Sequence, residues 1–272
     1  MAEEPVIVCD LDGVLWRGDT VIPGSSAAVE AFRAAGRRVA FLTNNSSHRV
    51  RDVVDRLAAI GVTASAADVL TSAQAAAALL AIDLAPGARV LACAGPGVVE
   101  ALSDAGYECV DAGSSAEVPA DDPYGAVVVG FHREFDFGRL DRAAAAVRAG
   151  ARFVATNLDA TYPASLRVLP GAGALVAAVA TASGCTPEVA GKPHSATVRL
   201  VHERLGRHGV MVGDRPSTDG VLAQRLDWPF AMVLSGIGGH DPMEPIPTEP
   251  APAWVADDLA GLVEALSGYG RG

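Results

Sequence analysis

The chain has 272 residues, of which 50% are hydrophobic, and its formal net charge is −11. This length suits one large domain or two smaller ones. The acidic balance argues against a surface that binds nucleic acid, although one local positive site suffices for a small phosphorylated ligand. The acidic first residues lack an apolar signal core, and the longest apolar stretch, Ala172–Ser183, is too short for a bilayer. We therefore expect a soluble, cytoplasmic protein that binds neither nucleic acid nor a membrane.

Strand and helix patterns alternate from the beginning of the chain. Val6–Cys9 is an apolar run rich in β-branched residues and predicts a short buried strand. Ser25 is the expected cap of a helix that runs to Ala35 and stops at Gly36. A second strand is expected over Val39–Leu42.

The alternation continues through the rest of the chain. Apolar residues at helical spacing predict a helix that begins at Ser47 and ends at Gly61. The remaining strands are expected at apolar runs that lie between further helices: Arg89–Cys93, Ala126–Val129, Phe153–Ala155, Val210–Val212, Ala231–Leu234 and the start of Trp254–Leu266. Such alternation is typical of parallel sheets with helices on both faces, so we predict an α/β fold with a Rossmann-like parallel-sheet core.

Polar residues follow several of the predicted strands, and the intervals between these polar residues are uneven. The interval between Asn45 and Lys192 is long enough for a whole domain, whereas the other intervals suit one helix and one strand. We therefore predict a core made of residues 1–73 and 188–272. Residues 74–187 would form an inserted α/β domain that lies over the functional edge of the core.

Two carboxylates, Asp10 and Asp12, end the first predicted strand, and Gly13 follows them. Burying ionised carboxylates is unfavourable unless a metal or a positive group compensates, so the pair indicates a polar site. Open α/β sheets bind their ligands at this carboxyl edge. A solvated turn is the alternative. An EF-hand loop is excluded, because Val14 and Val21 stand where its further acids would be.

Lys192 is the only lysine among the 21 basic residues. A surface lysine can be replaced by arginine at little cost, but a compact ammonium in a tight anion site cannot. The residue also lies in a loop that leads into a predicted helix. We interpret Lys192 as an anion-binding group, with chance survival on the surface as the alternative.

Four strand ends thus carry polar side chains. Asp10 and Asp214 on neighbouring strands would make an all-oxygen site that suits Mg²⁺. Thr43 and the backbone N–H groups after it can hold anionic oxygens, and Lys192 adds a positive charge. Metal, amide donors, a lysine and two free carboxylates are the components that phosphoryl transfer needs.

These residues resemble the four motifs of the haloacid-dehalogenase-like (HAD) phosphatases, in the same order. The motifs are Asp10-Leu11-Asp12-Gly13-Val14, Leu42-Thr43-Asn44, Lys192, and Gly213-Asp214 with Asp219. The long insert and the run Thr43-Asn44-Asn45-Ser46-Ser47 are similar to the NagD and p-nitrophenylphosphatase branch (subfamily IIA, with a C2-type cap). Pro216 and Gly220 depart from the branch, which usually has larger apolar residues there.

The resemblance implies a role for each carboxylate. Asp10 would be the nucleophile that forms an aspartyl-phosphate, and Asp12 the general acid and base. Asp10, Asp214 and the backbone carbonyl of Asp12 would hold Mg²⁺. Asp219 would orient the metal's waters or Lys192.

The resemblance also implies the groups that hold the substrate. Thr43, Asn44, Asn45 and Lys192 would bind the phosphoryl group. The segment after the predicted strand Phe153–Ala155 would be the cap loop, with leaving-group contacts at Asn157, Asp159, Tyr162 and Arg167. A purely structural interdomain loop is the alternative.

The expected function is Mg²⁺-dependent hydrolysis of the phosphate monoester of a small metabolite. Glycerol phosphate or phosphoglycolate is the first expectation, by family analogy alone. A nucleotide or pyridoxal phosphate phosphatase and a catalytically degenerate binding module of the same fold are the alternatives. A homodimer formed through the cap is also compatible with the resemblance.

Overall fold

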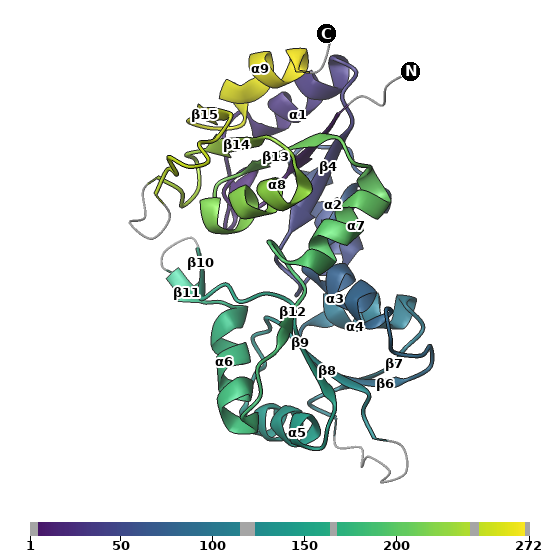
Figure 1. The fold of residues 1–272 in the computed structure, drawn as a ribbon. Helices are drawn as coiled ribbons and strands as arrows, with labels where there is room; N and C mark the ends of the chain where they lie inside the picture. Colours follow the sequence, from purple (N-terminus) through teal and green to yellow (C-terminus); the bar gives the residue numbers. More distant parts are fainter. Residues whose placement is uncertain (1–4, 115–122, 164–167, 240–244, 270–272) are drawn as a thin grey trace.

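The computed structural model describes residues 5–114, 123–163, 168–239 and 245–269. It contains two α/β units, each with its own parallel sheet (Figure 1). The first and last described elements of the chain belong to the first unit, and the second unit is inserted between two strands of the first. The predicted α/β class with an inserted α/β domain is confirmed.

The first unit, the core, is built on a six-stranded sheet in the order β15-β14-β13-β1-β4-β5. All its pairings are parallel. Its strands, in chain order, are β1 (Val6–Cys9), β4 (Val39–Thr43), β5 (Val69–Thr71), β13 (Gly209–Gly213), β14 (Phe230–Val233) and β15 (Trp254–Ala256). Because β13 and β4 flank β1, the residues that follow these three strands meet at one edge of the sheet.

Helices cover both faces of the core sheet. Alternate residues of β1 point to opposite faces, so Val6 and Val8 join one apolar cluster while Ile7 and Cys9 join another. The helices that pack on the Ile7 face are α1 (Ser25–Ala34), α2 (Val50–Ala59), and the C-terminal η3 (Ala260–Leu262) and α9 (Val263–Gly268). The helices on the Val8 face are α3 (Ser72–Leu80), α7 (Ser195–Leu205) and α8 (Val221–Leu226).

The second unit, the cap, has a five-stranded parallel sheet in the order β12-β9-β8-β6-β7. Its strands are β6 (Arg89–Cys93), β7 (Glu108–Asp111), β8 (Ala126–Val129), β9 (Arg152–Ala155) and β12 (Glu188–Val189), and its helices are α4 (Pro96–Asp104), α5 (Phe137–Arg148) and α6 (Ala172–Ser183). The division at residues 73/74 and 187/188 stays a prediction. The last strand of the cap sheet lies just beyond the second of these boundaries.

The remaining elements are small. They are η1 (Ala66–Asp68), the π-turn η2 (Pro216–Gly220), and two antiparallel hairpins, β2 (Trp16–Arg17) with β3 (Thr20–Val21) and β10 (Thr161–Pro163) with β11 (Val168–Pro170). The first hairpin follows β1 directly. The second rises from the cap toward the core (Figure 1).

Most of the predicted strands are confirmed, but two helix starts are wrong. Ser25 is the first residue of α1 rather than its cap, because its buried hydroxyl donates to the carbonyl of Leu15 at 3.2 Å. The second helix begins at Val50 and not at Ser47. Ser47 instead donates its backbone N–H and its hydroxyl to the Asn45 side chain, which keeps this segment in a turn.

Gly97 lies where cap helix α4 meets the core segment Ser46–His48. A Cβ atom on Gly97 would overlap the backbone carbonyl of His48 and lie 2.6 Å from that of Ser46. Gly97→Ala should therefore lower the free energy of unfolding, measured by urea denaturation, by about 1–3 kcal/mol.

Gly138→Ala is the matched control, because Gly138 is also the second residue of its helix and has room for a Cβ atom. It should leave stability unchanged or raise it by up to about 1 kcal/mol, since alanine favours helix. Equal stability of the two variants would contradict the close approach.

Candidate active site

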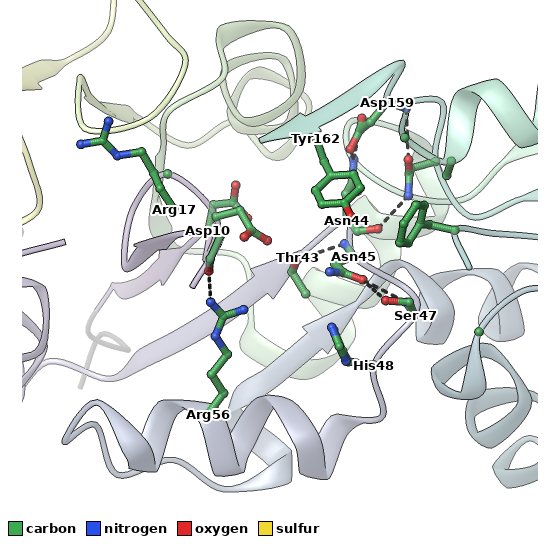
Figure 2. A pocket seen from close by; sticks show the side chains of 18 of the residues that line it. Asp10, Arg17, Thr43, Asn44, Asn45, Ser47, His48, Arg56, Asp159 and Tyr162 are labelled. Carbon is green, nitrogen blue, oxygen red and sulfur yellow. Dashed lines mark hydrogen bonds between the residues drawn. The ribbon is translucent and has the colours of Figure 1, made fainter. Parts of the chain in front are cut away.

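A cavity of about 1370 Å³ lies at the carboxyl edge of the core sheet, between the core and the cap. Residues from both units line it (Figure 2). The predicted site residues that line it come from segments far apart in the sequence: Asp10, Asp12, Thr43, Asn44, Asn45, Asn157, Asp159, Tyr162, Lys192 and Asp214. Asp219 lies behind them and is fully buried, and Arg167 lies outside the described residues.

Asp10 directly follows β1, and its backbone N–H donates to the carbonyl of Val212 on β13 at 2.8 Å. Only 7% of the residue is exposed. Burial, followed by the charges of Asp219 and Asp214, raises the pKa of Asp10, and the Lys192 ammonium opposes this rise.

Lys192 reaches this carboxylate from the loop before α7. Its Nζ lies 2.9 Å from Asp10 Oδ1 and 2.7 Å from Asp219 Oδ1, and it donates to the carbonyl of Leu42 at 3.5 Å. Burial alone would lower the pKa of the ammonium, but the two carboxylates outweigh it and raise the pKa. The only lysine of the chain is therefore a buried cation at the site and not a surface residue.

Asp10, Asp214 and Asp219 form a buried group whose carboxylate oxygens lie within 4.8 Å of one another. This group holds three carboxylates, and the one ammonium in contact with it is that of Lys192, which touches Asp10 and Asp219. The carboxylates therefore outnumber the ammonium that compensates their charge. The two oxygens of Asp214 differ: Oδ2 accepts the N–H of Ile237 at 2.7 Å, whereas Oδ1 is buried without a hydrogen-bond partner among the described residues. An unsatisfied buried carboxylate oxygen is costly, and oxygen donors of this kind suit Mg²⁺ or Ca²⁺. These residues therefore fit a divalent cation.

The loop after β1 leaves no room for a side chain beside Asp214. Gly13 has a φ of +90°, and a Cβ atom on it would lie 2.5 Å from the Asp214 carboxylate. Glycine at this position therefore lets the chain turn away from Asp12 and lets Asp214 approach the end of β1.

Asp12 lies two residues after Asp10 and is held by the hairpin that follows. Its Oδ1 accepts the indole N–H of Trp16 at 3.0 Å. Burial raises the pKa of this carboxyl, and the positive charge of Arg56 partly opposes the shift. A carboxyl with a raised pKa is suited to donating a proton near neutral pH.

The segment after β4 forms a turn around Asn45. The hydroxyl of Thr43 accepts the N–H of Asn45 at 3.0 Å, and the Asn45 side-chain oxygen accepts the N–H and hydroxyl of Ser47 at 3.0 and 2.7 Å (Figure 2). The Asn45 side-chain oxygen is thus used inside the turn. Thr43 keeps its hydroxyl hydrogen as a donor.

Asn44 joins the core to the cap. Its side chain accepts the backbone N–H of Lys192 at 2.8 Å and donates to the Lys192 carbonyl at 3.2 Å and, more weakly, to Asp159 at 3.3 Å. Its carbonyl accepts from the side chains of Ser72 and Asn157 at 2.6 and 2.7 Å. Asn44 therefore fixes both segments that connect the two units.

Asp159 and Tyr162 are two of the cap residues that line the cavity (Figure 2). Burial raises the pKa of Asp159, and the positive charges of Arg215 and Lys192 partly oppose this rise. The Tyr162 hydroxyl accepts from Arg133 at 3.2 Å, and its ring meets Phe131 edge-on with centroids 4.9 Å apart. The cap loop therefore faces the core site, and its contacts with a leaving group stay a prediction.

His48, Arg56 and Arg215 are among the cavity-lining side chains that the sequence patterns did not single out. Arg56 belongs to a helix that the pattern identified only by its apolar face. Among so many arginines, nothing in the sequence distinguishes the four that line the cavity in the described residues, Arg17, Arg56, Arg133 and Arg215. The role of Trp16, which donates to Asp12, was not predicted either, because its hairpin is too short to give a strand pattern.

Two family models match the chain. Residues 7–108 match the haloacid dehalogenase-like hydrolases, and residues 189–262 match a HAD-hydrolase-like model. The D-glycerol 3-phosphate phosphatase of Mycobacterium tuberculosis is 38% identical over 263 residues, which cover 96% of this chain and 71% of the relative. Phosphoglycolate phosphatase 2 of Arabidopsis thaliana is 33% identical, covering 84% and 82%. The chain belongs to the HAD-like hydrolases.

Solved structures refine this assignment to the NagD and p-nitrophenylphosphatase type (subfamily IIA). A glycerol phosphate phosphatase from M. tuberculosis in complex with magnesium superposes with a TM-score of 0.83 at 36% identity, covering 96% of this chain and 76% of that one. The p-nitrophenyl phosphatase of Archaeoglobus fulgidus gives 0.83 at 28%, covering 97% and 99%, and NagD of E. coli gives 0.78 at 27%, covering 94% and 98%. In the described part of this chain, no helix combines the length and apolarity that crossing a membrane requires.

Without metal, Asp214 should make stability depend on pH. Burial and then the Asp219 charge raise the pKa of Asp214 from 3.8 to about 7, so the folded state binds more protons than the unfolded state between these values. The free energy of unfolding should therefore fall as the pH rises through this window. Urea unfolding in EDTA at several pH values measures the slope.

Asp214→Asn should reduce that slope, because its side chain does not titrate. Asp141→Asn, an exposed position on cap helix α5, should keep the slope of the wild type. Parallel slopes for Asp214→Asn and the wild type would show that Asp214 is not the group responsible.

Proposed function

We propose that this chain, a phosphatase of small phosphate monoesters, works through a phosphoryl-aspartate on Asp10. The observation that carries the proposal is the position of Asp10 at the end of β1, 2.9 Å from a buried ammonium and beside a second carboxylate, Asp12. A nucleophile, a proton carrier and a cation are thus present together in a cavity of metabolite size.

In the first step, a carboxylate oxygen of Asp10 attacks phosphorus and the bond between phosphorus and the leaving oxygen breaks. Asp12 gives its proton to that oxygen, so the alcohol departs neutral. In the second step, Asp12 takes a proton from water, whose oxygen attacks the same phosphorus. The bond to Asp10 breaks, inorganic phosphate leaves, and both carboxyl groups return to their starting states.

The phosphoryl oxygens would be held by Lys192, by the Thr43 hydroxyl and by backbone N–H groups after β4. Asp219 supports this arrangement because it fixes the Lys192 ammonium at 2.7 Å. Asn44 acts on the same residue from the other side, through both backbone groups of Lys192. The Asn44 side chain thus orients the lysine, and its contribution to phosphoryl binding would come from its backbone.

The proposed cofactor is Mg²⁺, held by Asp10, Asp214 and the backbone carbonyl of Asp12. The unpartnered Oδ1 of Asp214 supports this assignment, as does the magnesium in the related crystal structure. When bound, the ion would neutralise charge on the phosphoryl oxygens and reduce repulsion between them and Asp10. Asp219 is the member of the triad less suited to the ion, because its oxygens already accept from Lys192 and Arg215.

For the substrate we propose glycerol phosphate first and phosphoglycolate second, since relatives with these names cover most of this chain. A nucleotide or pyridoxal phosphate stays the alternative. A homodimer through the cap stays a prediction, which light scattering of the purified protein would test.

Asp10→Asn should abolish Mg²⁺-dependent hydrolysis of p-nitrophenyl phosphate, with a loss of several orders of magnitude, because the amide is neither a nucleophile nor an anionic metal ligand. Asp12→Asn should instead accumulate the phosphoenzyme, because the second step lacks its base. Acid-quenched samples analysed by intact mass would show one added phosphoryl group in Asp12→Asn and none in Asp10→Asn.

The exposed Asp141→Asn should retain the wild-type rate in the same assay. Retention of more than a tenth of the wild-type rate by Asp10→Asn would refute the nucleophile assignment. A wild type that releases no phosphate with Mg²⁺ would refute the proposed function as a whole.

Tyr162 should influence which ester is preferred. Tyr162→Ala removes a ring that lines the cavity and its contacts with Phe131 and Arg133, so kcat/KM should fall more for the best metabolite ester than for methyl phosphate. A phosphate-release panel over phosphorylated metabolites measures both. An equal fall for every ester would show that Tyr162 has only a structural role.

A further inference from the structure

We infer that Trp16 and Arg56 are positioning residues that hold the Asp12 side chain in place for proton transfer. This inference rests on the proposed function, in which Asp12 is the acid and the base. It adds two residues that lie outside the four motifs and come from separate elements, a hairpin and a helix.

Backbone hydrogen bonds fix Trp16 to the segment that follows β1. The N–H of Gly13 donates to the Trp16 carbonyl at 2.7 Å, and the N–H of Trp16 donates to the Leu11 carbonyl at 3.3 Å. The indole is buried, with 2% exposure, and its Nε1–H donates to Asp12 Oδ1 at 3.0 Å. A buried donor of this kind fixes one oxygen of the carboxyl group and leaves the other for the leaving group.

Arg56 contacts the Trp16 ring from helix α2. The residue lies in the last turn of α2 and reaches toward the end of β1 (Figure 2). Its guanidinium carbon lies 4.0 Å from the centroid of the Trp16 ring, which is a cation–π contact, and one Nη donates to the carbonyl of Gly18. Arg56 therefore anchors both the indole and the hairpin that carries it.

Packing alone does not fix this group. A cavity of about 340 Å³ adjoins the three side chains and also touches His48 and Asp52. Because this space adjoins Asp12, the surrounding side chains do not enclose its carboxyl group on every side. Directional contacts from Trp16, and through it from Arg56, are what select one orientation.

The chemistry of the leaving group makes this role measurable. An alkoxide needs a proton as the phosphorus–oxygen bond breaks, whereas p-nitrophenolate leaves as a stable anion. A misplaced Asp12 should therefore slow cleavage of an alkyl phosphate and spare p-nitrophenyl phosphate. The value of kcat/KM covers substrate binding and this step, and it excludes the later hydrolysis of the phosphoenzyme.

The test compares kcat/KM for p-nitrophenyl phosphate with that for the best alkyl phosphate, using the full chain with Mg²⁺. Trp16→Phe keeps a buried ring but removes the N–H donor, and Arg56→Met keeps the length of the side chain but removes the charge. Each should lower kcat/KM for the alkyl ester about tenfold and that for the aryl ester less than about threefold. Should Trp16→Phe not fold, Arg56→Met reports on the same contacts.

Each variant has a control, for Arg56 on the same helix and for Trp16 on a different strand. Arg51→Met removes an exposed arginine from α2, and Trp254→Phe changes a partly buried tryptophan on β15. Both should keep the wild-type ratio of the two rates. In an Asp12→Asn background, Trp16→Phe should slow single-turnover cleavage of the alkyl ester no further, because the group through which it acts has been removed.

The inference fails if Trp16→Phe or Arg56→Met lowers both esters by the same factor, because that result would show a packing role only. It also fails if Trp16→Phe slows the Asp12→Asn enzyme further. Neither outcome affects the proposed function, which is tested separately by whether the wild type hydrolyses p-nitrophenyl phosphate and whether Asp10→Asn does not.

Discussion

The structure depends on burying three carboxylates at the end of parallel strands beside a single ammonium, which contacts two of them. Asp10, Asp214 and Asp219 meet because β1 and β13 are neighbours in the sheet, and Lys192 contacts two of the three. An excess of buried negative charge is unfavourable by itself, and it is retained where a cation or a substrate group compensates. The same imbalance that weakens the metal-free protein is what prepares the site to bind a divalent ion.

The position of Lys192 in the chain links the site to the cap. Lys192 belongs to the segment that returns from the cap to the core, so its ammonium is positioned only when that segment is in place. Asn44 holds the returning segment by its backbone and contacts Asp159 of the cap with the same side-chain amide. Asn44 thus links the position of the anion-binding lysine to the position of the cap, so a change in one should alter the other.

The sequence predicted the strands and the chemistry better than it predicted the supports around them. Arg89–Cys93 and Ala126–Val129 were predicted to the residue, because central parallel strands are apolar on both faces. The edge strand Glu108–Asp111 is only partly buried and has no such signal. The motif residues follow strands directly, so their meeting at one edge follows from the fold class.

Side chains that act across elements could not be found in this way. The link from Asn44 to Asp159 and the approach of Arg56 to Trp16 both depend on tertiary distances. Local patterns even misled at Ser25 and Ser47, since a serine that could cap a helix has other partners here.

One apolar cluster runs without a break from the Val8 face of the core sheet, through α3, α7 and α4, to Val90 and Val128 of the cap sheet. Because both sheets share it, the inserted unit has no complete core of its own on that side. The cap should therefore melt together with the core in one cooperative transition and should not persist when expressed alone.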